Sequence, residues 1–390
     1  MPPQRHIEAG GNKTELSIIL IGNNRCAVQH DEIIQTFSNM AVTCRIEHAE
    51  GGTAELSDSS ISPASCGQRH YMIIADCGCE PKMLLALWEA RRKADVVIAG
   101  TVPVSFAEGM RNKLVAWALS LPVKNPFPSA LITGGSASDE ALRAPNDWFP
   151  PGILTRTLAQ GFRVAEEPCP SGYVSGSGAL SGRADISKLL KLWSYRNSID
   201  SADYDYRAFF SRIPMQRYWQ RRRVAITVAL AGPPGRTLDI GCGSSVILGR
   251  FPGAIGLDAS MKKLRFQAGL GNSTVRADIA SLPFPDASFD TVICSQVIEH
   301  VPKSPAILDE LSRVIAPGGR LLLGTPDYGR AQWRIIESLY RKFQPRGYAD
   351  EHISHYDLEE VRREMESRGM KMDCARYIMG AELICRFLKP

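Results

Sequence analysis

Two glycines and three acids in the carboxyl-terminal half have the types and the spacing of a nucleoside-binding site. A short apolar run that contains Asp239 breaks into a loop with Gly241 and Gly243, whose missing side chains let the backbone approach a ligand closely. Asp258 ends the next apolar run, where a carboxylate can accept hydrogen bonds from both ribose hydroxyls. Asp278 ends a third run, where it can meet an adenine amino group. The set predicts a ligand that contains a nucleoside, and Asp239 can attract a positive charge on it.

The elements that must position these residues alternate between strand and helix. A helix is expected across residues 221–230, and the Gly-Pro-Pro-Gly stretch at 232–235 ends it. A second helix over residues 308–315 is expected to stop at the Pro-Gly-Gly stretch at 317–319. Apolar runs predict strands at residues 237–240, 254–258, 289–294 and 320–324. This alternation predicts an α/β sheet whose strand ends carry the site.

The order of DIGCG, GLD, ADI, FDTVICSQVIEHV and APGGRLLLGTP along the chain resembles the class I S-adenosylmethionine-dependent methyltransferases. The resemblance implies a Rossmann-like, seven-stranded domain over residues 223–390 and S-adenosylmethionine as its cofactor. A dinucleotide-dependent dehydrogenase is the nearest alternative, but it would need a third glycine where this chain has Val246. The residues expected to contact the methyl donor are Asp239, Gly241, Gly243, Asp258, Asp278, Ile279 and Ser295.

The groups that could handle a proton lie after the fourth strand and in a later histidine-rich stretch. Methyl transfer from a sulfonium needs alignment of the acceptor and removal of its proton. Glu299 and His300 follow the fourth strand, while His352 and His355 lie in residues 350–356. We expect His300 to be the general base, with His355 and Glu299 as further catalytic candidates. The alternative for His300 is a structural role in its own loop.

The sequence offers little evidence of a metal site. The ten cysteines are irregularly spaced and lack the paired pattern of zinc ligands. The related ubiquinone-pathway O-methyltransferases carry a glutamate three residues before the one matching Glu299, in a cluster that can hold magnesium, and here that position is Gln296. We therefore expect no metal, and we expect the cysteines to be reduced thiols of a cytoplasmic protein.

The amino-terminal half resembles, more distantly, the family 2 glycosyltransferases of the dolichol-phosphate mannosyltransferase type. Residues 16–24 correspond to their first strand, residues 71–81 to the strand that carries the metal-binding DxD motif, residues 94–98 to their ADVVIG strand, and residues 121–126 to their LPVRDP segment. The resemblance implies a GT-A-like α/β domain over residues 1–195.

The acids that such a glycosyltransferase needs are largely missing. Ala75 and Cys77 stand where the family has its metal-holding aspartates, with only Asp76 between them, and Thr101 and Asn125 replace a later arginine and aspartate. A glycosyl donor's diphosphate needs a cation held by carboxylates. We therefore expect this domain to lack transferase activity, and an active but unorthodox transferase is the alternative.

A connector that is rich in Tyr, Phe and Arg, residues 196–222, is expected between the two domains. Tyr204, Tyr206 and the aromatic-basic run around Trp219 are candidates for a lid over the donor. For Arg221 and Arg222 we favour the simpler interpretation, an amphipathic helix whose arginines are solvated.

The composition predicts a folded, soluble enzyme of two domains. The chain has 390 residues, of which 44% are hydrophobic and 22% charged, and this length exceeds what one core usually supports. The net charge of +5 is spread along the chain, so nucleic acid is not expected as a partner. No apolar stretch approaches the ~18 residues that span a bilayer.

The function expected from these features is O-methylation of a sugar-linked, lipid-linked or other small-molecule acceptor in the cytoplasm. Peripheral contact with a membrane and a homodimer are both left open. One alternative is methylation of an unrelated small molecule, with the first domain as a dimerisation scaffold. The others are a non-catalytic module that regulates a glycosyltransferase, and a fusion whose two halves are both active.

Overall fold

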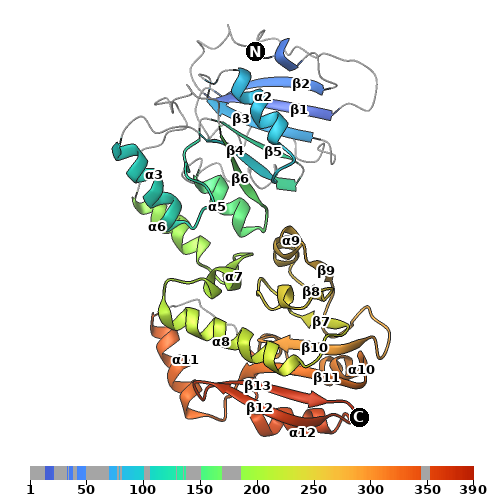
Figure 1. Ribbon diagram of the computed structural model, residues 1–390. Helices are drawn as coiled ribbons and strands as arrows, with labels where there is room; N and C mark the ends of the chain where they lie inside the picture. The colour runs from blue at the N-terminus through green and yellow to red at the C-terminus, as the bar shows by residue number, and fades with distance from the viewer. Residues whose placement is uncertain are drawn as a thin grey trace. The chain divides into compact units, whose positions relative to one another are not determined.

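The computed structural model describes residues 14–21, 33, 35–37, 42–49, 70–76, 79, 81–100, 106–128, 130–134, 136–137, 151–168, 186–343 and 352–390. The chain divides into two compact units, Met1–Asn197 and Ser198–Pro390, each built around its own sheet (Figure 1). The residues expected to connect two domains, 196–222, are helical for much of their length, and those from Ser198 onward belong to the second unit.

The first unit contains a six-stranded mixed sheet in the order β2-β1-β3-β5-β4-β6. Its strands are β1 (Thr14–Ile21), β2 (Val42–Ala49), β3 (His70–Asp76), β4 (Val96–Gly100), β5 (Ala130–Gly134) and β6 (Val164–Pro168). Strand β5 runs antiparallel to both of its neighbours, β3 and β4. The helices are α2 (Pro81–Ala90), α3 (Phe106–Ala118), α5 (Pro151–Ala159) and α6 (Ile186–Arg196).

Helices cover both faces of this first sheet because successive strand residues point to opposite sides. Met72 and Ile74 of β3 join a core with residues of α3, α5 and α6. Ile73 and Ala75 of the same strand join a second core, with residues of α2. The sheet is thus the middle layer of an α/β sandwich, as the alternating pattern predicts.

The second unit contains a seven-stranded sheet in the order β12-β13-β11-β10-β7-β8-β9. Its strands are β7 (Thr237–Ile240), β8 (Ile255–Asp258), β9 (Ser273–Arg276), β10 (Phe289–Ser295), β11 (Ile315–Pro326), β12 (Lys371–Ile378) and β13 (Glu382–Leu388). Strands β7 to β11 pair in parallel, and β13 runs antiparallel to β11 and β12. After β9 the chain returns to place β10 beside β7, which makes the carboxyl ends of these two strands a topological switch point.

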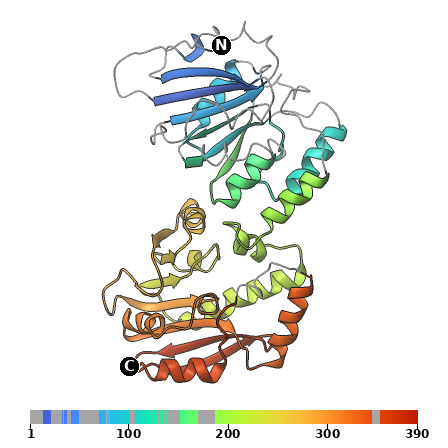
Figure 2. The ribbon, with the colours of Figure 1, turned by 180° about the vertical axis from the view of Figure 1, so that it is seen from behind.

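Helices and short 3₁₀ turns cover this second sheet. They are α7 (Tyr204–Phe209), α8 (Pro214–Ala231), η4 (Leu248–Arg250), α9 (Met261–Gly269), η5 (Ile298–His300), α10 (Pro305–Arg313), α11 (Ala331–Phe343) and α12 (Leu358–Glu366). Val292 and Cys294 of β10 pack in a core with α10 and α12, which lie side by side (Figure 2). Ile293 points to the other face and packs in a core with α8.

Two expected helix boundaries are wrong. Helix α8 begins at Pro214 rather than near Arg221, because proline fits the first turn of a helix, where its missing N–H is not needed. Helix α10 ends at Arg313, and the Pro-Gly-Gly stretch that follows lies inside β11 instead of before it. A register shift between β10 and β11 absorbs this stretch as a bulge.

Candidate functional site

A cavity of about 660 Å³ opens in the second unit at the carboxyl ends of β7, β8 and β10. Its volume lies in the range of small-molecule and cofactor sites, and its position matches the switch point of the sheet. All seven residues expected at the donor line it: Asp239, Gly241, Gly243, Asp258, Asp278, Ile279 and Ser295.

The glycine loop after β7 depends on the absence of side chains. Gly241 has φ +64° and Gly243 has φ +51°, conformations that other residues rarely adopt. A Cβ atom on Gly241 would lie only 2.3 Å from Cγ2 of Val297. The buried Gln267 Nε2 donates to the carbonyl oxygens of Gly243 (3.2 Å) and Ser245 (2.9 Å). Gln267 fixes the loop from α9, a role that the sequence analysis missed because the residue lies outside every motif.

The carboxylate of Asp258 is held at the mouth of this loop. Its Oδ2 accepts a hydrogen bond from the Gly243 N–H (2.9 Å), and its Oδ1 accepts one from the Ser260 N–H (2.8 Å). Each carboxylate oxygen can accept a second bond. The group is therefore oriented by the backbone and can still accept hydrogen bonds from a ligand in the cavity.

Asp239 is buried in the wall of the cavity, and its Oδ2 has no hydrogen-bond partner within the described residues. Burial, together with the nearby charge of Asp258, raises the pKa of Asp239 to about 8. A buried carboxyl group that lacks a partner is costly, and a positively charged ligand group would remove that cost. The position thus suits the pairing of Asp239 with a cation.

The other three residues expected at the donor form polar and apolar parts of the cavity wall. Asp278 lies two residues after β9, is exposed, and accepts a hydrogen bond from the Ala280 N–H (2.8 Å). Ile279 beside it is buried. Ser295 ends β10, and its buried Oγ has no hydrogen-bond partner in the described part of the chain.

Helices α7 and α8 form another wall of the cavity. Tyr204 and Trp219 line it, whereas Tyr206 packs against Phe266 and Phe210. The Trp219 Nε1–H donates to Glu382, a buried residue at the start of β13. Of the residues expected in a lid, Tyr204 and Trp219 thus form cavity wall and Tyr206 does not. Arg221 and Arg222 are exposed, as expected.

Glu382 is also the counter-ion of Arg223. The Nε and Nη2 atoms of Arg223 lie 2.6 and 2.7 Å from the two carboxylate oxygens. This bidentate pair joins α8 to β13 and lines the cavity. Nothing local in the sequence indicates it, because its two residues are 159 positions apart.

The structure separates the two histidines expected to act in catalysis. His300 lies in η5, directly after β10, and lines the cavity. His355 is exposed, does not line the cavity, and stacks on Tyr328 with ring centroids 4.0 Å apart. His352 lines the cavity instead, so the histidine-rich stretch reaches the site through a different residue from the one favoured above.

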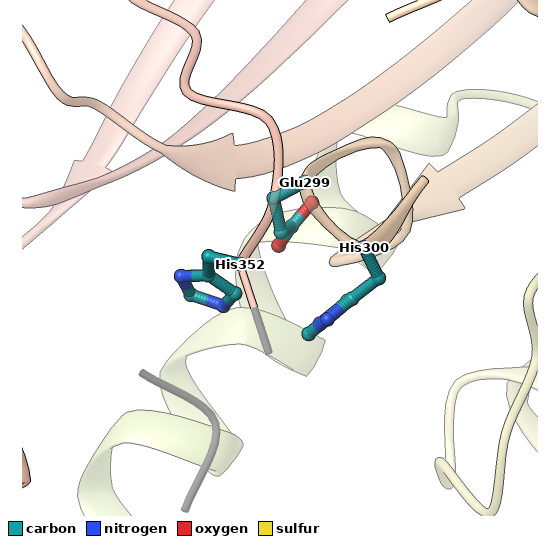
Figure 3. Close-up of side chains that lie close together, drawn as sticks. All are labelled: Glu299, His300 and His352. Carbon is teal, nitrogen blue, oxygen red and sulfur yellow. The ribbon is translucent and has the colours of Figure 1, made fainter. Parts of the chain in front are cut away.

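Glu299 is buried beside these histidines. Its Oε2 accepts a weak hydrogen bond from the Thr325 hydroxyl (3.4 Å), and its Oε1 has no hydrogen-bond partner among the residues described. Burial raises the pKa of Glu299 to about 8. Ligand atoms of Glu299, His300 and His352 all lie within 4.8 Å of one another, close enough to hold a metal ion (Figure 3). This grouping was not foreseen, because His352 is remote in sequence.

Comparison with known proteins identifies a domain within the second unit. Residues 238–323 match the family described as methyltransferase domain. The chain is 28% identical over 155 residues to the ubiquinone/menaquinone biosynthesis C-methyltransferase UbiE of Shewanella sp. (strain ANA-3), a stretch that covers 36% of this chain and 60% of that protein. It is 36% identical over 114 residues to an uncharacterized 37.1 kDa protein in transposon Tn4556 of Streptomyces fradiae, covering 26% of this chain and 33% of that protein.

A solved structure is also similar, that of an S-adenosylmethionine-dependent methyltransferase from Thermotoga maritima described as a possible histamine N-methyltransferase. The TM-score is 0.39 and the identity 19%, with 48% of this chain and 99% of that chain covered.

The second unit therefore contains a methyltransferase domain of Rossmann-like α/β fold, and S-adenosylmethionine is the cofactor that the domain implies.

Proposed function

We propose that the protein transfers the methyl group of S-adenosylmethionine to a hydroxyl oxygen of a sugar-linked, lipid-linked or other small acceptor. The observation that carries the proposal is the buried Asp239, which lines the cavity and whose Oδ2 has no hydrogen-bond partner among the described residues. The backbone-held carboxylate of Asp258 lines the same cavity. Asp239 would pair with the donor's ammonium group, and Asp258 would accept hydrogen bonds from the ribose hydroxyls.

The charge of the cavity supports a cationic ligand. Six carboxylic acids line it. Glu382 and Arg223 neutralise each other, and the pKa of Asp239 is raised, which leaves four acids (Asp205, Asp258, Asp278 and Glu337) against Lys263. S-adenosylmethionine carries both a sulfonium and an ammonium group, so this wall would attract it. A dinucleotide, whose diphosphate is negative, would be repelled.

The acceptor would lie beyond the donor's methyl group, near His300 and His352. His300 is our candidate for the group that handles the acceptor's proton, since imidazole titrates near working pH. His352 is the second candidate, in place of His355, which does not line the cavity.

The first unit supports a sugar-containing or lipid-containing acceptor through its resemblance to glycosyltransferases. We propose that it binds or presents the acceptor and does not transfer sugar. Ala75 and Asp76 lie at the carboxyl end of β3, where that resemblance places the metal-binding acids, while Cys77 and Thr101 lie outside the described residues. Asn125 is buried, and its Oδ1 accepts hydrogen bonds from Asn112 Nδ2 (3.1 Å) and the Phe127 N–H (3.0 Å), a structural role. A cytoplasmic location and a homodimer stay predictions.

Methylation of carbon is the second candidate, because one similar protein is described as a C-methyltransferase. The aligned stretch spans 60% of that protein. The reaction of that relative therefore indicates only that the product should also be examined for a new carbon-bound methyl group.

The test is a transfer assay on the full chain with methyl-labelled S-adenosylmethionine and separate panels of polyprenyl-phosphate sugars, free sugars and hydroxylated aromatic rings. We expect one panel to accept label, with the product's NMR spectrum showing a methoxy group. His300→Ala should lower turnover by ~100-fold to 10,000-fold with donor affinity nearly unchanged. His355→Ala is the matched control. A drop of less than about fivefold in the His300 variant would mean that alignment alone carries the reaction.

A further inference from the structure

We propose that Glu299, His300 and His352 bind one divalent first-row transition-metal ion in the wall of the cavity, where the ion would contact an acceptor oxygen. Metal binding itself can be tested without any turnover, whereas the contact with the acceptor rests on the proposed function. The three side chains come from η5 and from the segment after residue 351, and Figure 3 shows them pointing toward a common space.

The segment that carries His352 is fixed against η5 by hydrogen bonds. The N–H groups of Ile353 and Ser354 both donate to the carbonyl oxygen of Glu299, at 2.9 and 3.1 Å. The Ser354 hydroxyl donates to the carbonyl oxygen of Val301 at 2.6 Å. His352 is therefore brought to Glu299 by backbone contacts of its own neighbours, so the grouping does not depend on the rotamers of long surface side chains.

The ring of His352 is oriented as a metal ligand's ring usually is. Its Nδ1 lies 2.8 Å from the Tyr328 hydroxyl, and that hydroxyl donates to Glu337 Oε1 at 3.1 Å. Because an ionised carboxylate can only accept, we assign the hydroxyl hydrogen to the bond with Glu337, and with this assignment Nδ1–H of His352 donates to the hydroxyl oxygen. The lone pair for a metal is then on Nε2, the arrangement that outer hydrogen bonds impose on metal-binding histidines. Trp333 stacks on the same ring, with centroids 5.9 Å apart.

Glu299 supplies the independent sign that a cation belongs here. The side chain is fully buried, its Oε1 has no hydrogen-bond partner among the described residues, and its Oε2 has only the long bond to Thr325. A buried acid with an unpaired oxygen carries a cost that a cation would remove. The ring centroids of His300 and His352 lie 4.9 Å apart beside Glu299. The groups that could share a cation with Glu299 are therefore imidazoles.

The ligand set indicates the class of ion. Two imidazoles and one carboxylate suit Zn²⁺, Mn²⁺, Fe²⁺ or Co²⁺, whereas Mg²⁺ and Ca²⁺ prefer oxygen ligands. Three protein ligands leave a coordination position open for a substrate oxygen. A bound ion would lower the pKa of an acceptor hydroxyl that contacts it, so that the O–H proton passes to solvent as the oxygen takes the methyl group and the demethylated donor is released. His300 would then serve as a ligand of the ion rather than as a general base.

The experiment uses the full chain without a polyhistidine tag, stripped with chelator and dialysed. Titration with Co²⁺ should give visible absorption bands that saturate at one ion per chain, and Zn²⁺ should displace it while millimolar Mg²⁺ should not. His352→Ala should weaken Co²⁺ binding by at least 100-fold, and Tyr328→Phe, which keeps the ring but loses the hydroxyl, by about tenfold. His355→Ala is the matched control, since it also removes a ring that packs on Tyr328, and should bind Co²⁺ as the parent protein does.

Binding of the demethylated donor keeps this proposal separate from the proposed function. Asp258→Ala should retain the Co²⁺ site and lose donor affinity, and His352→Ala should do the reverse. Failure of the parent protein to bind Co²⁺ at one ion per chain, or equal loss in the His352 and His355 variants, would overturn the metal site and leave donor binding untouched. If His352→Ala does not fold, the parent titration and Tyr328→Phe still decide the matter.

Discussion

The carboxyl group of Asp239 is buried beside Asp258, and both features raise its pKa to about 8. An aspartate in an unfolded chain has a pKa near 3.9, so between about pH 4 and 8 the folded apoprotein holds a proton that the unfolded chain has lost. The contribution of this group to the free energy of unfolding is therefore complete below the pKa of the unfolded chain. It is lost as pH rises through the pKa of the folded protein. A donor ammonium would pair with the ionised form, and binding would then release the proton.

We therefore predict that affinity for the demethylated donor rises with pH between 6 and 8, by up to about tenfold per pH unit, with up to one proton released per molecule bound. Calorimetry in two buffers of different ionisation enthalpy measures the proton count. Asp239→Asn should bind more weakly and lose most of this pH dependence. The same slope in both proteins would assign the titration to another group.

At this residue scale, the sequence was enough to predict that the residues we assign to the donor lie together, whereas the grouping of His352 with His300 was not predictable. Asp239 lies in β7, Gly241 directly follows it, and Asp258 is the last residue of β8, the strand next to β7 in the sheet. Local motifs in this order are therefore enough to bring the three residues together. His352 reaches the site only because Ile353 and Ser354 bond to the carbonyl oxygen of Glu299. No side-chain pattern encodes such a backbone contact, so the sequence could not separate His352 from His355.

At the scale of elements, one carboxylate on β13, that of Glu382, bonds to two side chains of α8, beside the apolar core that both elements share. The side chain of Glu382 is only 1% exposed and that of its partner Arg223 is 15% exposed, while Trp219 bonds to the same carboxylate. Removing the charge of Glu382 would leave a nearly buried guanidinium without its counter-ion.

We predict that Glu382→Gln lowers the free energy of unfolding by about 2 to 3 kcal/mol, somewhat below the usual cost for a fully buried pair because Arg223 keeps some solvent contact. The midpoint of urea unfolding measures it. Glu366→Gln is the control, because its ion pair with Arg362 is exposed and should contribute under about 0.5 kcal/mol. Similar losses in the two variants would show that the pair does not anchor the helix.

Strands with a clear local pattern of apolar residues were predicted from the sequence. Strands that are recognised only by their hydrogen bonds to a neighbouring strand were not. Strands β7 and β10 are apolar runs between clear breaks, and their predicted bounds agree with the structure to within one residue. The antiparallel strand β12 mixes charged and apolar residues, so only the resemblance implied a sheet large enough to include it. Gly318 and Gly319 were expected to end a helix, and they lie in the bulge of β11 instead. The sequence could not distinguish the two, because glycine is favoured both in β-bulges and at the ends of helices.

At the scale of the whole molecule, each unit has its own sheet and cores, and the site described here belongs entirely to the second. None of the helices in the described ranges is long and apolar enough to cross a membrane. We propose, from the order of its sequence segments alone, that the first unit is a glycosyltransferase-like domain with few of the acids that would hold a metal.

We predict that the full chain neither hydrolyses nor transfers sugar from nucleotide sugars. By the resemblance to family 2 glycosyltransferases, Ala75 and Cys77 stand where two acids would hold the cation of a diphosphate. Incubation with Mn²⁺ and a panel of labelled nucleotide sugars checks this. Turnover above background that Asp76→Asn abolishes would show that the remaining aspartate suffices for catalysis.

Donor binding by the second unit is the claim on which the proposed methyl transfer depends. Calorimetry with S-adenosylmethionine on the full chain tests it most directly. We predict micromolar affinity, about 7 to 8 kcal/mol, and a loss of ~1.5 to 3 kcal/mol, roughly tenfold to a hundredfold, in Asp258→Ala. Asp309→Ala, which removes an exposed acid on α10, should leave the affinity unchanged. No binding by the parent protein, or equal affinity in the Asp258 and Asp309 variants, would contradict the site proposed here.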